Sequence, residues 1–133
     1  MPLLLSYIVG PILGLALFSS FALSAESSVR EPAFQENFYV VKIRGNRSWI
    51  VGYYGSILFS EDRGATWTIQ QSGTRRALFR ADFINDDKGW VSGSYGTVLH
   101  TENGGKSWLR QKSGTTEHLF GIDFVNERSG WAV

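Results

Sequence analysis

The feature that most constrains this chain is an eight-residue motif that occurs twice at a fixed spacing. Residues 60–67 read Ser-Glu-Asp-Arg-Gly-Ala-Thr-Trp, and residues 101–108, which lie 41 positions later, read Thr-Glu-Asn-Gly-Gly-Lys-Ser-Trp. The same offset relates Trp49, Trp90 and Trp131. A period of this length, with short β-type runs inside it, indicates a repeat architecture.

Each motif, here called a box, has the composition of a tight hairpin loop between two apolar, β-prone runs. An Asp or Asn side chain can accept bonds from loop N–H groups, a Gly tolerates positive φ, and a Ser or Thr hydroxyl adds a local bond. The Trp that closes each box is expected to be buried between repeats. We therefore predict structural roles for Ser60, Asp62, Gly64, Thr66, Trp67, Thr101, Asn103, Gly105, Ser107 and Trp108.

The chain around the boxes shows period-2 patterning and Gly-rich turns, which favour short strands and disfavour a helical repeat. Strands are expected at residues 38–43, 48–52, 56–60, 66–71, 78–84, 90–93, 97–101, 107–112, 119–126 and 130–133. Four antiparallel strands in about 41 residues make one blade of a β-propeller. The predicted fold is therefore all-β, with two blades and part of a third.

Two blades and part of a third are too few for closure, because propellers have at least about four blades. We expect the chain to be a fragment of a longer propeller. The alternative is a short chain that closes by self-association.

The first 36 residues differ in composition from the repeats. Residues 1–25 carry no charged side chain and end in small residues, which is typical of a cleaved export signal, with an uncleaved membrane anchor as the alternative. Residues 26–36 are polar and are expected to form a linker. We thus predict an exported protein whose propeller occupies residues 37–133 and whose contact with a membrane is limited to an uncleaved N-terminus.

Composition excludes several classes of function. The chain has no cysteine, so it has neither a disulfide framework nor a thiolate metal site. Its net charge is +1, and this balance points to no nucleic-acid partner. His100 and His118 lack ligand spacing, and Asp86-Asp87 is read as a solvated turn, with calcium binding as the alternative. No cofactor is predicted.

The second unit carries a specific repeat pattern. Residues 89–108 fit G-W-x-x-G-x-x-G-T-[IV]-L-x-T-x-[DN]-G-G-x-[ST]-W, with Asn103 at the Asp position, while Arg63 replaces a frequent Gly in the first box. Residues 38–133 resemble the BNR/Asp-box repeats of the photosystem II stability/assembly factor family, in particular its exported bacterial relatives. The resemblance implies a non-enzymatic β-propeller that binds a protein subunit of a membrane complex; photosynthetic members have seven blades.

Because sialidases also carry Asp-boxes, a carbohydrate-active enzyme is the alternative function. Such an enzyme needs an arginine triad, a Tyr nucleophile with a carboxylate partner, and an acid/base Asp. Tyr54 and Tyr95 recur at equivalent places, as do Asp82 and Asp123, whereas a nucleophile is needed only once. No catalytic residue is predicted, although further blades could hold a site.

Three arginines follow the last strand of the first unit. Arg75 and Arg76 lie on the connecting loop, and Arg80 lies at the start of the next inner strand. The corresponding positions of the next unit are Thr116, Glu117 and Gly121, so these arginines are not part of the repeat. Arginine suits anchoring of partner carboxylates, and we predict that these three residues bind a protein partner.

Overall fold

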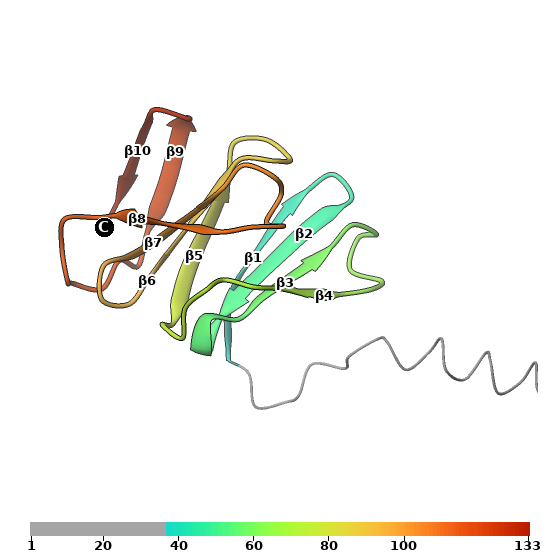
Figure 1. Cartoon of the computed structure of the whole chain (residues 1–133). Coiled ribbons are helices and arrows are strands. Elements are labelled where there is room, and N and C mark those ends of the chain that lie inside the picture. The colour runs from blue at the N-terminus through green and yellow to red at the C-terminus, as the bar shows by residue number, and fades with distance from the viewer. Residues whose placement is uncertain (1–36) are drawn as a thin grey trace, which may run out of the picture. The chain divides into compact units, whose positions relative to one another are not determined.

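The computed structural model describes residues 37–133, and within this range the structure is built from β-sheets (Figure 1). The first sheet has the order β1-β2-β3-β4, the second β5-β6-β7-β8, and the third pairs β9 with β10; all neighbours are antiparallel. The strands are β1 (Phe38–Arg44), β2 (Arg47–Gly52), β3 (Ile57–Ser60), β4 (Thr68–Gln70), β5 (Leu78–Phe83), β6 (Gly89–Gly93), β7 (Thr97–Thr101), β8 (Leu109–Lys112), β9 (Ile122–Asn126) and β10 (Ser129–Ala132).

The sheets lie side by side as blades, with β1, β5 and β9 as their inner strands (Figure 1). β5 contacts both β1 and β9, whereas β4 and β8 are the outer edges of the two four-stranded blades. This arrangement confirms the predicted all-β fold with four-stranded antiparallel blades.

Strand register defines which residues are equivalent in the three blades. Lys42 pairs with Trp49. Asp82 pairs with Trp90, and Asp123 pairs with Trp131. The inner strand is irregular at its beginning in the first two blades, where the pairing skips Tyr39 and Phe79.

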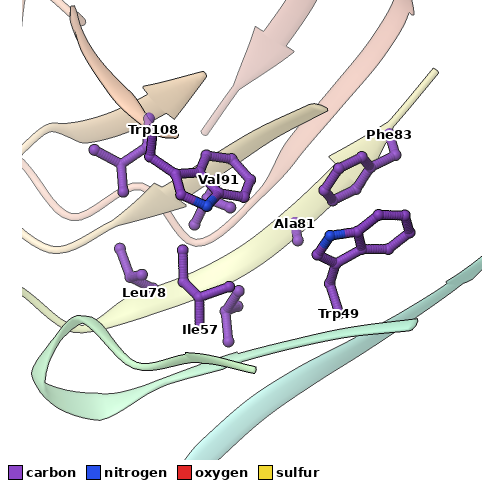
Figure 2. Packing of buried hydrophobic residues seen from close by; sticks show 9 residues of the cluster. Trp49, Ile57, Leu78, Ala81, Phe83, Val91 and Trp108 are labelled. Atoms are coloured by element: carbon purple, nitrogen blue, oxygen red, sulfur yellow. The ribbon is translucent and has the colours of Figure 1, made fainter. Parts of the chain in front are cut away.

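The main hydrophobic core lies between the first two blades (Figure 2). Trp49 is fully buried and stacks on Phe83 of the next blade, with ring centroids 4.0 Å apart. Trp90 repeats this contact with Phe124 of the third blade at 3.8 Å. The same indole-on-phenyl contact therefore joins successive blades, because the repeat places the two rings at the same positions each time.

The two box tryptophans differ in burial. Trp108 is 8% exposed and packs into the core of the first two blades, as predicted (Figure 2). Trp67 is only half-buried, so the prediction that it is buried is wrong. Trp108 lies against the blade that precedes its own, whereas no sheet covers the corresponding side of β1–β4 within residues 37–133.

Strand boundaries differ from the prediction mainly around the boxes. β4 and β8 begin one residue after Trp67 and Trp108, because the box loops include the tryptophans. β9 begins at Ile122, since residues 119–121 belong to the connection that precedes it. The predictions for residues 1–25 and 26–36 lie outside the described range. In the part of the chain that the structure describes, no helix is long and apolar enough to cross a membrane.

Candidate partner-binding surface

The first box is closed by its own side chains. One carboxylate oxygen of Asp62 accepts bonds from the Ser60 hydroxyl and the Thr66 N–H, at 2.7 and 2.8 Å. The other accepts the Thr66 hydroxyl at 2.6 Å. The hydroxyl of Ser60 accepts the Gly64 N–H at 2.8 Å. These bonds leave little capacity on Asp62 for an outside ligand.

The second box repeats this network with an amide in place of the carboxylate. Asn103 accepts the Ser107 N–H at 2.9 Å and donates its amide to the Ser107 hydroxyl at 2.8 Å. The Thr101 hydroxyl lies 3.0 Å from the Asn103 oxygen and accepts the Gly105 N–H at 2.8 Å. Asp and Asn serve equally here because both present an acceptor oxygen to the loop.

The bonds in the first box also change the acidity of Asp62. Hydrogen bonds from the Thr66 hydroxyl and N–H, followed by the Ser60 hydroxyl, lower the pKa of this carboxyl to about 2. Each of these donors favours the charged form. Asp62 is therefore ionised throughout the neutral range as part of the loop network.

The end of the blades that carries the boxes, here called the box face, has balanced charge. It comprises the β1–β2, β3–β4, β5–β6, β7–β8 and β9–β10 hairpin loops, together with the strand ends Arg44 and Arg47 that flank the first loop. Its acidic residues are Glu61, Asp62, Asp86, Asp87, Glu102 and Glu127, and its basic residues are Arg44, Arg47, Arg63, Lys88, Lys106 and Arg128.

Several of these charges pair between neighbouring blades. Arg44 and Arg47 of the first blade lie 3.7 and 3.8 Å from Asp86 and Asp87 of the second. Lys88 of the second blade pairs with Glu127 of the third. Much of the charge on the box face is thus engaged within the protein.

The opposite end of the blades has a different chemistry. It comprises the beginnings of β1, β5 and β9, the 3-10 turn η1 (Tyr53–Gly55), and the connections at residues 72–77, 93–96 and 113–121. We call it the aromatic face, after Tyr39, Tyr53, Tyr54, Phe79, Tyr95, His118 and Phe120. In Figure 1 it is the lower edge of the sheets, where η1 lies.

A row of rings crosses this face from blade to blade. Tyr39 meets Phe79 edge to face at 5.4 Å, and Phe79 stacks on Phe120 at 4.8 Å. Tyr39 and Phe79 are the residues that the strand pairing skips, and Phe120 lies 41 residues after Phe79. The rings at the irregular starts of β1 and β5, and the ring just before β9, thus lie beside one another.

A second group surrounds Tyr95. The guanidinium of Arg76 lies over the Tyr95 ring, 4.3 Å from its centroid, as in a cation–π contact. The His118 ring meets the same ring edge to face at 4.9 Å, and its Nδ1 accepts the Tyr95 N–H at 3.1 Å. Arg76 is therefore held over an exposed ring and not left free in solvent.

The structure places the three predicted arginines at the aromatic face. Arg75 and Arg76 are exposed on the β4–β5 connection, and Arg80 is exposed as the third residue of β5. Within residues 37–133, none of the three forms an ion pair with a carboxylate. Their positive charge is thus not neutralised by the described part of the chain.

The residues considered for glycosidase chemistry are not gathered into a catalytic arrangement. Tyr54 and Tyr95 occupy equivalent turns of different blades. Asp82 is buried and bonded to the Lys42 ammonium and the Phe124 N–H, at 2.7 and 2.8 Å. Its equivalent, Asp123, is exposed. Residues 37–133 also contain no group of three His, Cys, Asp or Glu side chains that could hold a metal ion.

Sequence reasoning missed most of the aromatic face. It treated Tyr54 and Tyr95 only as repeated blade residues and did not single out Tyr39, Phe79 and Phe120. The available signal was an aromatic residue at the start of each predicted inner strand. Its significance depends on contacts between strands about 41 residues apart, which a local pattern does not reveal.

Comparisons with known proteins identify the fold of this chain but match it to no family. No family model and no curated protein matches the chain. Among solved structures, YCF48 from Cyanidioschyzon merolae matches with a TM-score of 0.63 and 17% identity, covering 76% of this chain and 36% of that chain. This chain therefore spans little more than a third of the length of that protein. The likeness supports the β-propeller fold.

Proposed function

We propose that this protein is a non-enzymatic, exported β-propeller scaffold that binds a protein partner. Its repeat motif resembles the BNR/Asp-box repeats of photosystem II stability/assembly factors, and its fold is similar to that of YCF48, which is such a factor. Export is proposed because the N-terminal sequence resembles a signal. By analogy, the partner is a subunit of a membrane complex.

The observation that carries the proposal is the unpaired positive charge of Arg75, Arg76 and Arg80. Exposed charges contribute little to stability, so the fold does not need three arginines at one end beyond the packing of Arg76 over Tyr95. Arginine is enriched in the energetically important parts of protein interfaces. We expect these residues to dock an acidic or phosphate-bearing surface of the partner.

Replacement of all three arginines by Ala tests this function. The triple variant should capture the partner from a detergent-solubilised envelope extract at least about tenfold more weakly, because it lacks the complementary charge. Its melting temperature should change little. Capture should be quantified by mass spectrometry at low and at high salt, since screening weakens exposed charges.

A matched control removes the same number of charges from the box face. In this control Arg63→Gly, Lys106→Ala and Arg128→Ala are combined, and Gly is used because Arg63 has φ of 61°. The control should capture the partner normally. Equal capture by the wild type and the Arg75/Arg76/Arg80 variant at low salt would overturn the site assignment.

A further inference from the structure

We infer that the aromatic face recognises an acidic segment of the partner in which carboxylates accompany an aromatic anchor residue. The inference rests on the proposed protein-binding function and adds the chemistry of the bound segment. Its evidence is the distribution of exposed rings, the backbone conformation of two tyrosines, and the charge that surrounds them.

Exposed rings are concentrated at this end of the blades. Tyr54 is 70% exposed, Phe120 63% and Tyr95 53%, and Tyr39 and Tyr53 are also exposed. The loops of the box face defined above carry no Tyr or Phe, and of their two tryptophans Trp108 is buried and Trp67 is half-buried. Clustered exposed aromatic residues mark interaction sites, because they lose contact with water when a partner covers them.

Two of these rings are held on strained backbone. Tyr54 and Tyr95 have φ of 53° and 55°, in the left-handed region that favours Gly and Asn. A bulky residue in this region costs stability, and Tyr54 recovers little of that cost through burial because its ring is mostly exposed. Such strain is typical of functional sites, where the side chain serves a purpose other than folding.

Tyr54 and Tyr95 are exposed because they lie on turns at the end of their blades. Both turns connect neighbouring strands within one blade, at residues 53–55 and 94–96. A further blade beside the described sheets would pack on their lateral faces, whereas the turns form the end of the blade. We therefore assign Tyr54 and Tyr95 to the surface that a partner meets.

The charge of the aromatic face selects an acidic occupant. Its connections at residues 72–77, 93–96 and 113–121 carry Arg75 and Arg76 and the single acid Glu117, and Arg80 adds a positive charge at the start of β5. By contrast, the acids and bases of the box face are equal in number. Arg76 already lies over Tyr95, so a carboxylate bound there would meet a guanidinium that is positioned before binding, beside a ring that can pack against an anchor residue.

Protein is favoured over other polyanions because Tyr and Arg are the residues most enriched at interface hot spots. A suitable probe is a fluorescein-labelled peptide that alternates Asp and Phe with Ser spacers. Two matched peptides replace Phe by Ser or Asp by Asn. Measured by fluorescence anisotropy, the wild-type chain should bind the Asp/Phe peptide at least about fivefold more tightly than either matched peptide.

The Tyr54→Asn and Tyr95→Asn double variant separates binding from stability. Asn tolerates the left-handed region, so the variant should melt at the same or a higher temperature. It should nevertheless bind the Asp/Phe peptide at least about fivefold more weakly, because the rings are lost. Arg63→Asn, at a left-handed position of the box face, is the matched control and should bind as the wild type does.

Wild-type affinity of the tyrosine variant for the Asp/Phe peptide would overturn the inference. So would equal binding of the three peptides, or tighter binding of heparin or phosphatidylglycerol vesicles than of the Asp/Phe peptide. These results leave the proposed function standing if the arginine variant still loses the envelope partner. Failure of the proposed function is instead shown by normal capture with that arginine variant.

Discussion

Replacing Trp49 by Ala is expected to lower the free energy of unfolding by about 3–5 kcal/mol. The indole is fully buried and stacks on Phe83 of the next blade. Its N–H donates to the Gly104 carbonyl at 3.1 Å, and the substitution removes this bond while the Gln70 amide still donates to the same carbonyl at 2.9 Å. Chemical denaturation of the full chain, followed by tyrosine and tryptophan fluorescence, measures the loss.

Trp131 supplies a matched control because it occupies the equivalent position in the third blade. It is 66% exposed, so Trp131→Ala should cost less than about 1 kcal/mol. Equal losses from the two substitutions would contradict the view that contacts between blades, and not the tryptophan position itself, determine stability.

Replacing Asp82 by Ala is expected to cost about 2–3 kcal/mol at neutral pH. This buried carboxylate joins three blades, because it accepts the Lys42 ammonium of the first blade and the Phe124 N–H of the third. Without Asp82, the Phe124 N–H loses this partner and the partly buried ammonium loses its counter-ion. Differential scanning calorimetry of both proteins measures the effect.

The stabilisation by Asp82 should also depend on pH. Burial alone would raise the pKa of this carboxyl, but the bonds from Lys42 and Phe124 outweigh burial and lower the pKa below its usual value. Because the pKa of Asp82 is lower in the folded than in the unfolded state, its charged form stabilises the fold at pH values above the ordinary carboxyl pKa. This stabilisation is lost as the pH falls through the folded-state pKa. The difference between wild type and Asp82→Ala should therefore shrink in acid.

Asp123 is the control for Asp82, because it is the equivalent residue of the third blade and is exposed. Asp123→Ala should change stability by less than about 0.5 kcal/mol. A loss as large as that of Asp82→Ala would show that the position, and not the ion pair between blades, accounts for the effect.

Much of the fold could be predicted because it depends on local sequence patterns. The box loops bond within eight residues, and β1 alternates in burial along its seven residues, so both leave short-range signals. The equivalence of Trp49, Trp90 and Trp131 followed from the 41-residue period alone. The antiparallel order of each four-stranded blade then followed from short connections.

The remaining features depend on contacts between blades. Trp67 and Trp108 occupy equivalent positions in the two boxes, yet only Trp108 meets a preceding blade within residues 37–133 and is buried there. The pairing of Lys42 with Asp82 joins equivalent positions that carry different residues. A repeat pattern predicts which positions of successive blades are equivalent. The contacts between blades depend on the residues that differ between the repeats at those positions.

The two ends of the blades illustrate the same distinction. On the box face, hydrogen bonds within the boxes and ion pairs between blades serve the fold. On the aromatic face, Arg75, Arg76 and Arg80 depart from the repeat, and Tyr54 and Tyr95 keep a strained conformation without burial. Sequence reasoning singled out the arginines because they do not recur, and it treated the tyrosines as blade residues because they do.

The most direct test of the account is site-specific photo-crosslinking from the two faces. A benzophenone amino acid would replace Tyr54 on the aromatic face or Arg63 on the box face; both positions are exposed and have positive φ. After irradiation in an envelope extract, we expect a defined protein adduct from position 54 that acidic peptide competes away, and none from position 63. Adducts from position 63 alone, or equal adducts from both positions, would contradict binding through the aromatic face.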